Sequence, residues 1–151
     1  MTIRRFSTDE IPSLLDMRRA MTLELDGKDL DDDPIWRDRF SAFLLELLDK
    51  NETMYFVAEH DGALVGMGGV YKLRNHRSVI YGQPSAYVTS VYVMPAHRRN
   101  GIARAITQAT VDWARENGCV VVRLRASRMG RMVYEAMGFT PTEELELPLT
   151  R

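Results

Sequence analysis

The most informative part of the chain is residues 91–104, which read VYVMPAHRRNGIAR. Its first residues are aromatic or β-branched, as in a strand, and the run stops at Pro95, which cannot donate to a sheet ladder. After Gly101 the apolar residues recur at helical spacing. A strand that leads through a glycine-containing turn into a helix exposes unpaired backbone N–H groups at the positive end of the helix dipole. The stretch therefore predicts an anion-binding site between a strand and a helix.

Phosphate is the anion that this turn suits. Gly101 has no side chain and lets the backbone come close to a phosphate, and Ala103 is small enough to leave room. Arg98, Arg99 and Arg104 add positive charge beside the turn. A P-loop fits less well because no Gly-Lys-Ser/Thr follows, and a Rossmann turn fits less well because its three-glycine fingerprint is absent.

The N-terminal part of the chain predicts a short strand and two helices. Residues 2–6 suit the strand, and Ser7 with Glu10 forms a capping box for a helix that ends near residues 25–27. Pro34 suits the first turn of the second helix. The core-facing positions are Ile11, Leu14, Leu15 and Arg18 in the first helix, and Trp36, Phe40, Phe43, Leu44 and Leu47 in the second.

The middle of the chain predicts a hairpin followed by a βαβ unit. Residues 54–59 and 63–71 form the hairpin, and residues 72–85 are a polar connection without regular structure. Strands at 86–94 and 120–125 flank the helix that follows Gly101, so they are expected to be parallel with a right-handed crossover.

The C-terminal part predicts a short helix at 130–137 and a last strand at 144–147. We expect Met129, Met132, Val133 and Ala136 to form the buried stripe of this helix, with Tyr134 off the stripe. Antiparallel strands first and one βαβ unit later define an α+β fold.

Composition limits the classes of protein to consider. With 151 residues, the chain is expected to form a single domain over residues 1–151. A net charge of -1 gives no general attraction to nucleic acid or to an anionic membrane. No signal peptide or membrane-spanning run is evident, and Cys119 is the only cysteine, so we expect a cytoplasmic protein. His76 and His97 lack partners at ligand spacing, which predicts no metal site.

Three segments of the chain resemble the GCN5-related N-acetyltransferase (GNAT) family. Residues 98–103 match its Arg/Gln-x-x-Gly-x-Gly/Ala signature, and residues 91–95 look like its fourth strand. Residues 134–139, in the expected order, resemble its Tyr-Glu-x-x-Gly-Phe segment. The resemblance implies a mixed, mostly antiparallel sheet with splayed central strands. It also implies an N-acetyltransferase that moves an acetyl group from acetyl-CoA to a primary amine by direct attack.

The resemblance also implies roles for residues. Backbone N–H groups of residues 99–104 would hold the CoA pyrophosphate, and Val91 and Val93 would pair with the pantetheine arm. Tyr134 would protonate the leaving thiolate, which a phenol with a reference pKa of about 10 can do at neutral pH. The residues expected to contact the cofactor are Val91, Tyr92, Val93, Arg98, Arg99, Asn100, Gly101, Ile102, Ala103, Arg104, Ser127, Arg131 and Tyr134.

Ser127 departs from the family pattern, and Arg131 has two interpretations. Ser127 stands where many family members have an asparagine, although its hydroxyl can make one comparable hydrogen bond. Arg131 either approaches the cofactor or is a solvated helix residue. The segment 126–135 still resembles a recurring subgroup with Ala-Ser-x-x-Gly-Arg-x-x-Tyr-Glu.

The base and the acceptor are less clearly marked. Glu24 is the candidate base, with Asp26, Asp29 and Glu59 as alternatives. The acidic run 29–33 either attracts a cationic acceptor or is a solvated loop. The acceptor is a small-molecule or peptide amine, with a small molecule favoured.

Other interpretations stay open at this point. A noncatalytic acyl-CoA-binding or sensing domain would keep Gly101 and Ala103 without needing Tyr134. A nucleotide-binding module would use the same helix start for another phosphate. The tyrosines around the middle strands either line an acceptor pocket or pack in the core; they are Tyr71, Tyr81, Tyr87 and Tyr92. The last two share a face only if the strand has a bulge. Acyl-chain length and homodimerisation, which is common in the family, are also open.

Overall fold

The computed structural model describes residues 1–150. Helices and strands follow one another in nearly the order that the sequence predicts. The strands are β1 (Thr2–Arg5), β2 (Thr53–His60), β3 (Ala63–Leu73), β4 (Ser85–Val93) and β5 (Val122–Leu124). The helices are α1 (Ile11–Asp26), α2 (Trp36–Asp49), α3 (His76–Tyr81), α4 (Ile102–Glu116) and α5 (Arg131–Ala136), with short 3-10 turns η1 (Thr8–Glu10), η2 (Leu30–Asp32) and η3 (Pro95–His97).

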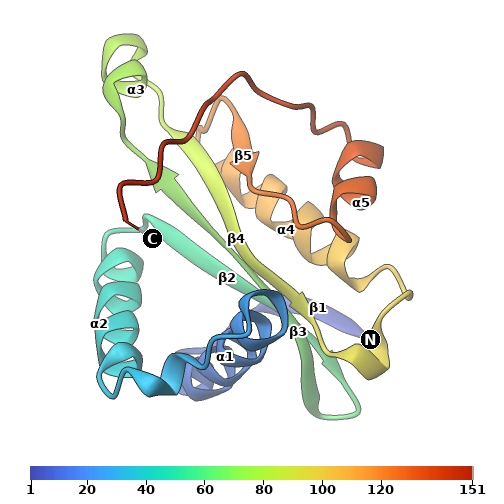
Figure 1. Cartoon of the computed structure of the whole chain (residues 1–151). Helices are drawn as coiled ribbons and strands as arrows, with labels where there is room; N and C mark the ends of the chain where they lie inside the picture. The colour runs from blue at the N-terminus through green and yellow to red at the C-terminus, as the bar shows by residue number, and fades with distance from the viewer. Residues whose placement is uncertain (151) are drawn as a thin grey trace.

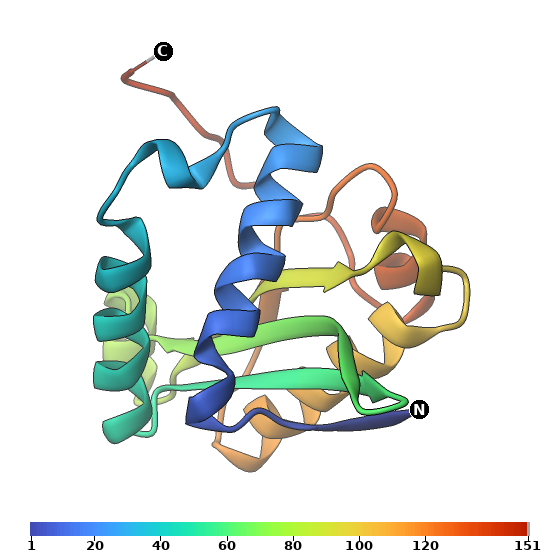
Figure 2. The ribbon, with the colours of Figure 1, turned by 90° about the horizontal axis from the view of Figure 1, so that it is seen from below.

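One sheet with strand order β1-β2-β3-β4-β5 forms the centre of the molecule (Figure 1). Neighbouring strands are antiparallel except β4 and β5, which are parallel and are connected through α4. Helices α1 and α2 cover one face of the sheet and α4 covers the other, with α5 beside α4 (Figure 2). The α+β prediction, with the hairpin and the βαβ unit, is confirmed. None of the helices in the described residues is long and apolar enough to cross a bilayer.

Two apolar clusters hold these layers together, and glycines in β3 allow close packing on both faces. One cluster lies under α1 and α2, and the other lies under α4. A Cβ atom on Gly68 would lie 2.5 Å from Cγ2 of Ile106 in α4. A Cβ on Gly69 would lie 2.5 Å from Cζ of Tyr55. These contacts fix how closely α4 and the Tyr55 ring can approach the sheet.

Strand β4 contains a bulge. Its register with β3 shifts between Met67 and Gly69, and Ser90 has a positive φ of 57°. The extra residue places Tyr87 and Tyr92 on the same face. Tyr92 belongs to the cluster under α1 and α2, and Tyr87 packs against Tyr71 at a ring-centroid distance of 5.7 Å. The bulge that Tyr87 and Tyr92 need in order to share a face is therefore present.

Two predictions of local structure are wrong. Residues 76–81, expected to be irregular, form α3, because Asn75 and Ser78 make a reciprocal capping box. Residues 144–147, expected to be a strand, pair with no strand, although their alternating pattern has strand periodicity. Leu145 is 99% and Leu147 80% exposed. A strand needs a ladder partner, which this segment lacks in the described chain.

Candidate active site

A cleft with a volume of about 650 Å³ runs along the C-terminal end of β4, and we call it the β4 cleft. It lies between α1, the loop that leads into α4, and α5. Its lining residues are Met21, Glu24, Leu25, Val91, Tyr92, Val93, Pro95, His97, Arg98, Arg99, Gly101, Ile102, Ala103, Arg104, Ser127, Met129, Gly130, Val133 and Tyr134. Of the residues expected to contact the cofactor, all except Asn100 and Arg131 line this cleft.

The β5-facing edge of β4 is open along the cleft. Pairing with β5 covers only residues 86–88 of β4, so the sheet splays beyond Val88. Met94 N–H donates to the Val65 carbonyl of β3, and backbone groups alternate in direction along a strand. The polar backbone groups of Val91 and Val93 therefore face away from β3, toward the cleft. They are available to an extended ligand that lies beside β4 as an added strand.

The start of α4 presents backbone N–H groups to the other end of the cleft. Gly101 caps the helix with a positive φ of 74° and no side-chain cap, and the first N–H that bonds back into the helix is that of Ala105. The N–H groups of residues 102–104 have no partner within the helix. Arg99 and Arg104 line the cleft nearby, and neither makes an ion pair within residues 1–150. This arrangement suits a phosphate group.

Asn100 and Arg98 have structural partners. The Asn100 side-chain amide donates to the backbone carbonyls of His97 and Arg98, which closes the turn. Arg98 lies over the Tyr92 ring and donates from Nε to the Val93 carbonyl at 2.9 Å. Both of its terminal nitrogens bind the Glu24 carboxylate at 2.7 Å. The positive charge of Arg98 is thus largely balanced by Glu24, so Arg98 adds little positive potential to the cleft.

Glu24 is poorly suited to act as a base in this geometry. The hydrogen bonds and charge of Arg98 hold the pKa of the Glu24 carboxyl below its ordinary value. Both carboxylate oxygens are occupied, and a lowered pKa weakens proton acceptance near neutral pH. The sequence could not reveal the pair because its members are 74 residues apart.

Tyr134 is the buried residue of α5, only 9% exposed, and it lines the cleft. Its ring packs edge-on against Phe139, with 5.9 Å between centroids. Burial raises the pKa of the Tyr134 phenol, and the nearby Thr107 hydroxyl opposes this in part. The phenol is therefore protonated at neutral pH and can donate a proton.

The predicted buried stripe of α5 is wrong. Met129 is 73% and Met132 80% exposed, and Ala136 is also exposed. The helix has only six residues and rests on α4 mainly through Tyr134, so the periodic pattern was too short to indicate its buried face.

Ser127 and Arg131 both make hydrogen bonds at the start of α5. The Ser127 hydroxyl accepts a hydrogen bond from the Gly130 N–H at 3.1 Å, and it also lines the cleft. Arg131 binds Glu135 one turn along the helix at 2.7 Å and lies outside the cleft lining. Of the two interpretations of Arg131, this geometry favours the solvated helix residue.

A second cavity of about 380 Å³ lies between α1, α2 and the sheet, and we call it the aromatic cavity. Of its twelve lining residues, the sequence indicated only Tyr71 as a candidate for an acceptor pocket, because six others had been assigned to core-facing helix positions. Its lining residues are Arg18, Leu30, Trp36, Phe40, Phe43, Leu44, Leu47, Thr53, Tyr55, Tyr71, Thr89 and Ser90. The available signal was Arg18, a charged residue at a core-facing position of α1. The two cavities adjoin at β4, where Ser90 lines one and Val91 the other.

Comparison with known proteins identifies the family. The sequence profile of the acetyltransferase (GNAT) family matches residues 12–139. The chain belongs to the GNAT family of acetyltransferases. It is an acetyl-CoA-dependent N-acetyltransferase, as the sequence resemblance implied.

Relatives of known structure and name agree with this GNAT assignment. A GCN5-related N-acetyltransferase from Ralstonia eutropha JMP134 superimposes with a TM-score of 0.83 at 28% identity, covering 98% of this chain and 97% of that one. A predicted acetyltransferase from Clostridium acetobutylicum, solved with acetyl-CoA, gives a TM-score of 0.83 at 25% identity, covering 98% and 96%. The aminoglycoside N(6')-acetyltransferase type 1 of Acinetobacter genomosp. 13 is 28% identical over 121 residues, covering 74% of this chain and 81% of its own.

The β4 cleft fits the acetyl-CoA that GNAT enzymes use. Acetyl-CoA brings pyrophosphate oxygens, which need N–H donors and cations, and amides, which need an open strand edge. The N–H groups of residues 102–104 with Arg99 and Arg104 meet the first need, and Val91 meets the second. A Cβ on Gly101 would have no atom within 4 Å beyond its chain neighbours, so its positive φ, rather than crowding, favours glycine there.

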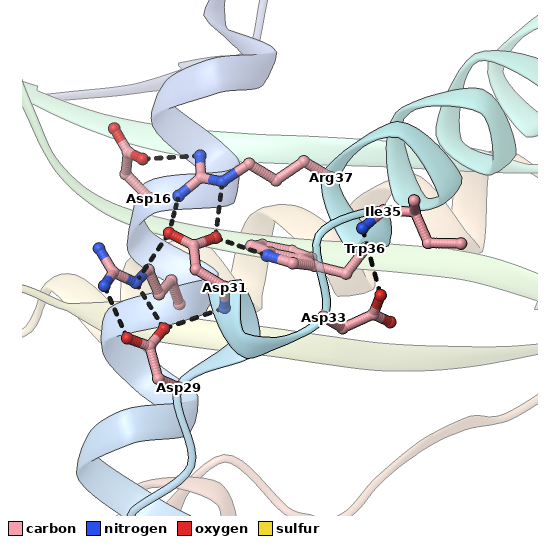
Figure 3. Close-up of polar contacts among 8 residues, drawn as sticks. Asp16, Asp29, Asp31, Asp33, Ile35, Trp36 and Arg37 are labelled. Carbon is pink, nitrogen blue, oxygen red and sulfur yellow. Dashed lines mark hydrogen bonds and ion pairs between the residues drawn. The ribbon is translucent and has the colours of Figure 1, made fainter.

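Most carboxylates in the connection between α1 and α2 are bound by arginines. Arg19 holds Asp29 at 2.7 Å, which lowers the Asp29 pKa to about 2 (Figure 3). Arg37 binds Asp31, and the same Asp31 accepts from the Trp36 indole N–H (Figure 3). The acidic run is thus a folded connection in which most aspartates pair with arginines of α1 and α2.

The remaining candidates for base or ligand are no better placed. Glu59 pairs with Arg4 at the far edge of the sheet, and neither Glu59 nor Asp26 lines either cavity. Within residues 1–150, no three His, Cys, Asp or Glu side chains gather closely enough to hold a metal ion.

Proposed function

We propose that this enzyme acetylates the primary amine of a small molecule by direct attack of the amine on acetyl-CoA. The observation that carries the proposal is the β4 cleft, which joins an open strand edge, an uncapped helix start and a buried phenol. The aromatic cavity adjoins it and has the volume for part of a small acceptor. Several relatives are named aminoglycoside acetyltransferases, which supports a small acceptor over a protein.

Residues of the cleft would bind and orient the acetyl donor. The N–H groups of residues 102–104, with Arg99 and Arg104, hold the pyrophosphate, while Val91 and Val93 face the pantetheine arm. When bound, acetyl-CoA supplies the electrophilic acetyl group as a thioester. A backbone N–H at this edge, such as that of Val91, polarises the thioester carbonyl as negative charge develops. The Val93 carbonyl already accepts a hydrogen bond from Arg98, so Val91 makes more of the backbone hydrogen bonds to the pantetheine arm.

The reaction balances with one acid and a route for two protons from the nitrogen. The amine nitrogen forms a bond to the acetyl carbon, and the carbon–sulfur bond breaks. Tyr134 donates its proton to the leaving sulfur, so that CoA departs as a thiol. As the amide forms, the nitrogen releases a second proton to water in the cleft, and the phenol regains its proton from that water. An alkylamine has a pKa near 10 and must lose a proton first. Because Glu24 is bound to Arg98, we assign this proton to water in the cleft.

The same proposal covers the domain organisation and the location of this chain. Residues 1–151 form one N-acetyltransferase domain, and the reducing cytoplasm suits its single Cys119. A noncatalytic acyl-CoA sensor is the competing function. It would not require a buried, protonated phenol at the cleft.

Replacement of Tyr134 by phenylalanine tests the proposal. We expect Tyr134→Phe to lower kcat on the order of 100-fold, since general acid catalysis contributes at least that much. Turnover is measured as CoA thiol release with a panel of amines, and acetyl-CoA affinity by calorimetry. That affinity should be nearly unchanged, because the substitution keeps the ring and leaves Arg99, Arg104 and the backbone N–H groups of residues 102–104 in place. Tyr81→Phe, at an exposed tyrosine in α3, is the matched control. Undiminished turnover in Tyr134→Phe would show that Tyr134 only packs.

A further inference from the structure

The aromatic cavity carries information about the acceptor. Side chains of α2 form one wall, and Tyr55 and Tyr71 of the sheet form the floor. Apart from Arg18 and the Trp36 indole N–H, which donates to Asp31, its polar side-chain groups are hydroxyls, including those of Thr53, Thr89 and Ser90. No carboxylate lines the cavity. An acceptor placed here meets mostly apolar surface and a single charged group, which is positive.

Arg18 is the charged group, and most of its donors are unused. One terminal nitrogen donates to the Ser90 hydroxyl at 3.1 Å and contacts the Met21 sulfur at 3.6 Å. In the described part of the chain, Arg18 makes no ion pair. Its neighbour Arg19 and also Arg37 are each held by aspartates. A half-buried guanidinium with free donors, in a cavity without acids, matches the planar fork of a carboxylate.

Arg18 lies where an acceptor must meet the acetyl donor. Its two contacts, Ser90 and Met21, belong to the boundary between the cavities, because Met21 lines the β4 cleft. A polar ligand group at this boundary would therefore meet the Arg18 donors that the protein leaves unpaired.

A polycationic acceptor fits this surface poorly. The acidic run between α1 and α2 would be its natural attraction, yet Asp29, Asp31 and Asp33 are each bound by an arginine. In the cavity itself, ammonium groups would face Arg18 and aromatic walls, with no carboxylate to pair with them. This contrasts with the aminoglycosides that appear in the names of several relatives.

We propose that the acceptor is an amino acid with an apolar side chain, whose carboxylate binds Arg18 and whose side chain fills the aromatic cavity. The amino group then lies at the boundary with the β4 cleft, beside Ser90 and Val91. This inference rests on the proposed function, since it names the substrate class of the same site.

Thiol release with matched acceptors tests the inference. Phenylalanine, leucine and methionine are compared with phenethylamine, which lacks the carboxylate, and with tobramycin, an aminoglycoside. We expect kcat/KM for phenylalanine to exceed that for phenethylamine on the order of 100-fold, the loss typical of one partner of a half-buried charge pair. Arg18→Gln should remove this preference by lowering kcat/KM for phenylalanine about 100-fold more than kcat/KM for phenethylamine. Arg19→Gln, a loss of charge on the same helix outside the cavity, is the control and should keep the preference.

Calorimetric binding of phenylalanine to the CoA-loaded protein separates the two claims. Arg18-dependent binding without thiol release would support the acceptor class and overturn the transfer function. Turnover of tobramycin or phenethylamine at least as efficient as that of amino acids would support transfer and overturn the acceptor class. An equal loss for all acceptors in Arg18→Gln would also overturn it, as would the absence of both binding and turnover for every amino acid.

Discussion

Single residues set the charge balance of the β4 cleft. Glu24 neutralises Arg98, while Arg99 and Arg104 keep their charge for a ligand. The positive potential is therefore concentrated at the start of α4, where the backbone N–H groups also point. The Arg98–Glu24 pair links α1 to the loop after β4, so its role is to hold the cleft wall in place.

Replacing Glu24 by glutamine separates a base from a structural partner. We expect Glu24→Gln to lower kcat less than about 10-fold and to leave the acidic limb of the pH–rate profile in place, because the lost group is an ion-pair partner. Loss of a general base would cost on the order of 10² to 10⁴-fold. The measurement is the pH dependence of thiol release, with Asp26→Asn as a control on the same helix. A loss in that larger range, with the acidic limb abolished, would restore Glu24 as the base.

At the residue scale, the sequence predicted what depends on local spacing. The turn at Gly101 and the position of Tyr134 in the cleft follow from short motifs. The Arg98–Glu24 pair and the exposure of Arg18 to a cavity depend on α1 packing against β4, and no local pattern encodes that contact. Arg18 was visible only as a charge in an apolar stripe.

At the scale of elements, β3 positions α4 through its glycines. We expect Gly68→Ala to lower the free energy of unfolding by about 1–3 kcal/mol, because its Cβ would overlap the Ile106 side chain in a packed core. Gly66→Ala should cost less, since its nearest contact would be 3.1 Å. Urea denaturation of both variants measures the difference. Wild-type stability in Gly68→Ala would mean that α4 is not seated against β3 as described.

The connection between α1 and α2 predicts a pH dependence. Arg19 lowers the pKa of Asp29 from 3.8 to about 2 in the folded state. A carboxyl whose folded pKa is depressed contributes stability that is complete above its unfolded pKa and is lost as the pH falls through the folded value. We therefore expect the urea midpoint to fall between about pH 4 and pH 2, and to fall less in Asp29→Asn. An identical pH profile for the variant would contradict the Arg19 pair.

Element order could be predicted from the sequence more fully than element ends. Strands and long helices carry strong periodicity, so the α+β order was confirmed. Helix α3 was missed because its capping box has serine where glutamate is usual, and α5 was too short to show its buried face. The strand at residues 144–147 was wrong because periodicity indicates a strand but supplies no partner.

At the scale of the whole molecule, both cores share one sheet. Trp36 lies in the core under α1 and α2, and Trp113 lies in the core under α4. These are the only two tryptophans, so Trp36→Phe and Trp113→Phe each leave one reporter. We expect each remaining tryptophan to report the same midpoint as circular dichroism of that variant, as a single cooperative domain requires. Separate transitions within one variant would contradict a single domain.

The transfer of an acetyl group to an amine nitrogen is the central claim, and product analysis with ¹³C-acetyl-CoA tests it most directly. The wild-type protein is incubated with labelled acetyl-CoA and a mixture of small primary amines, amino acids included, and released CoA is compared with labelled products by NMR. We predict one labelled N-acetyl amide for each CoA released, with little labelled acetate. Release of CoA with labelled acetate alone, or bound acetyl-CoA that no amine discharges, would contradict the account.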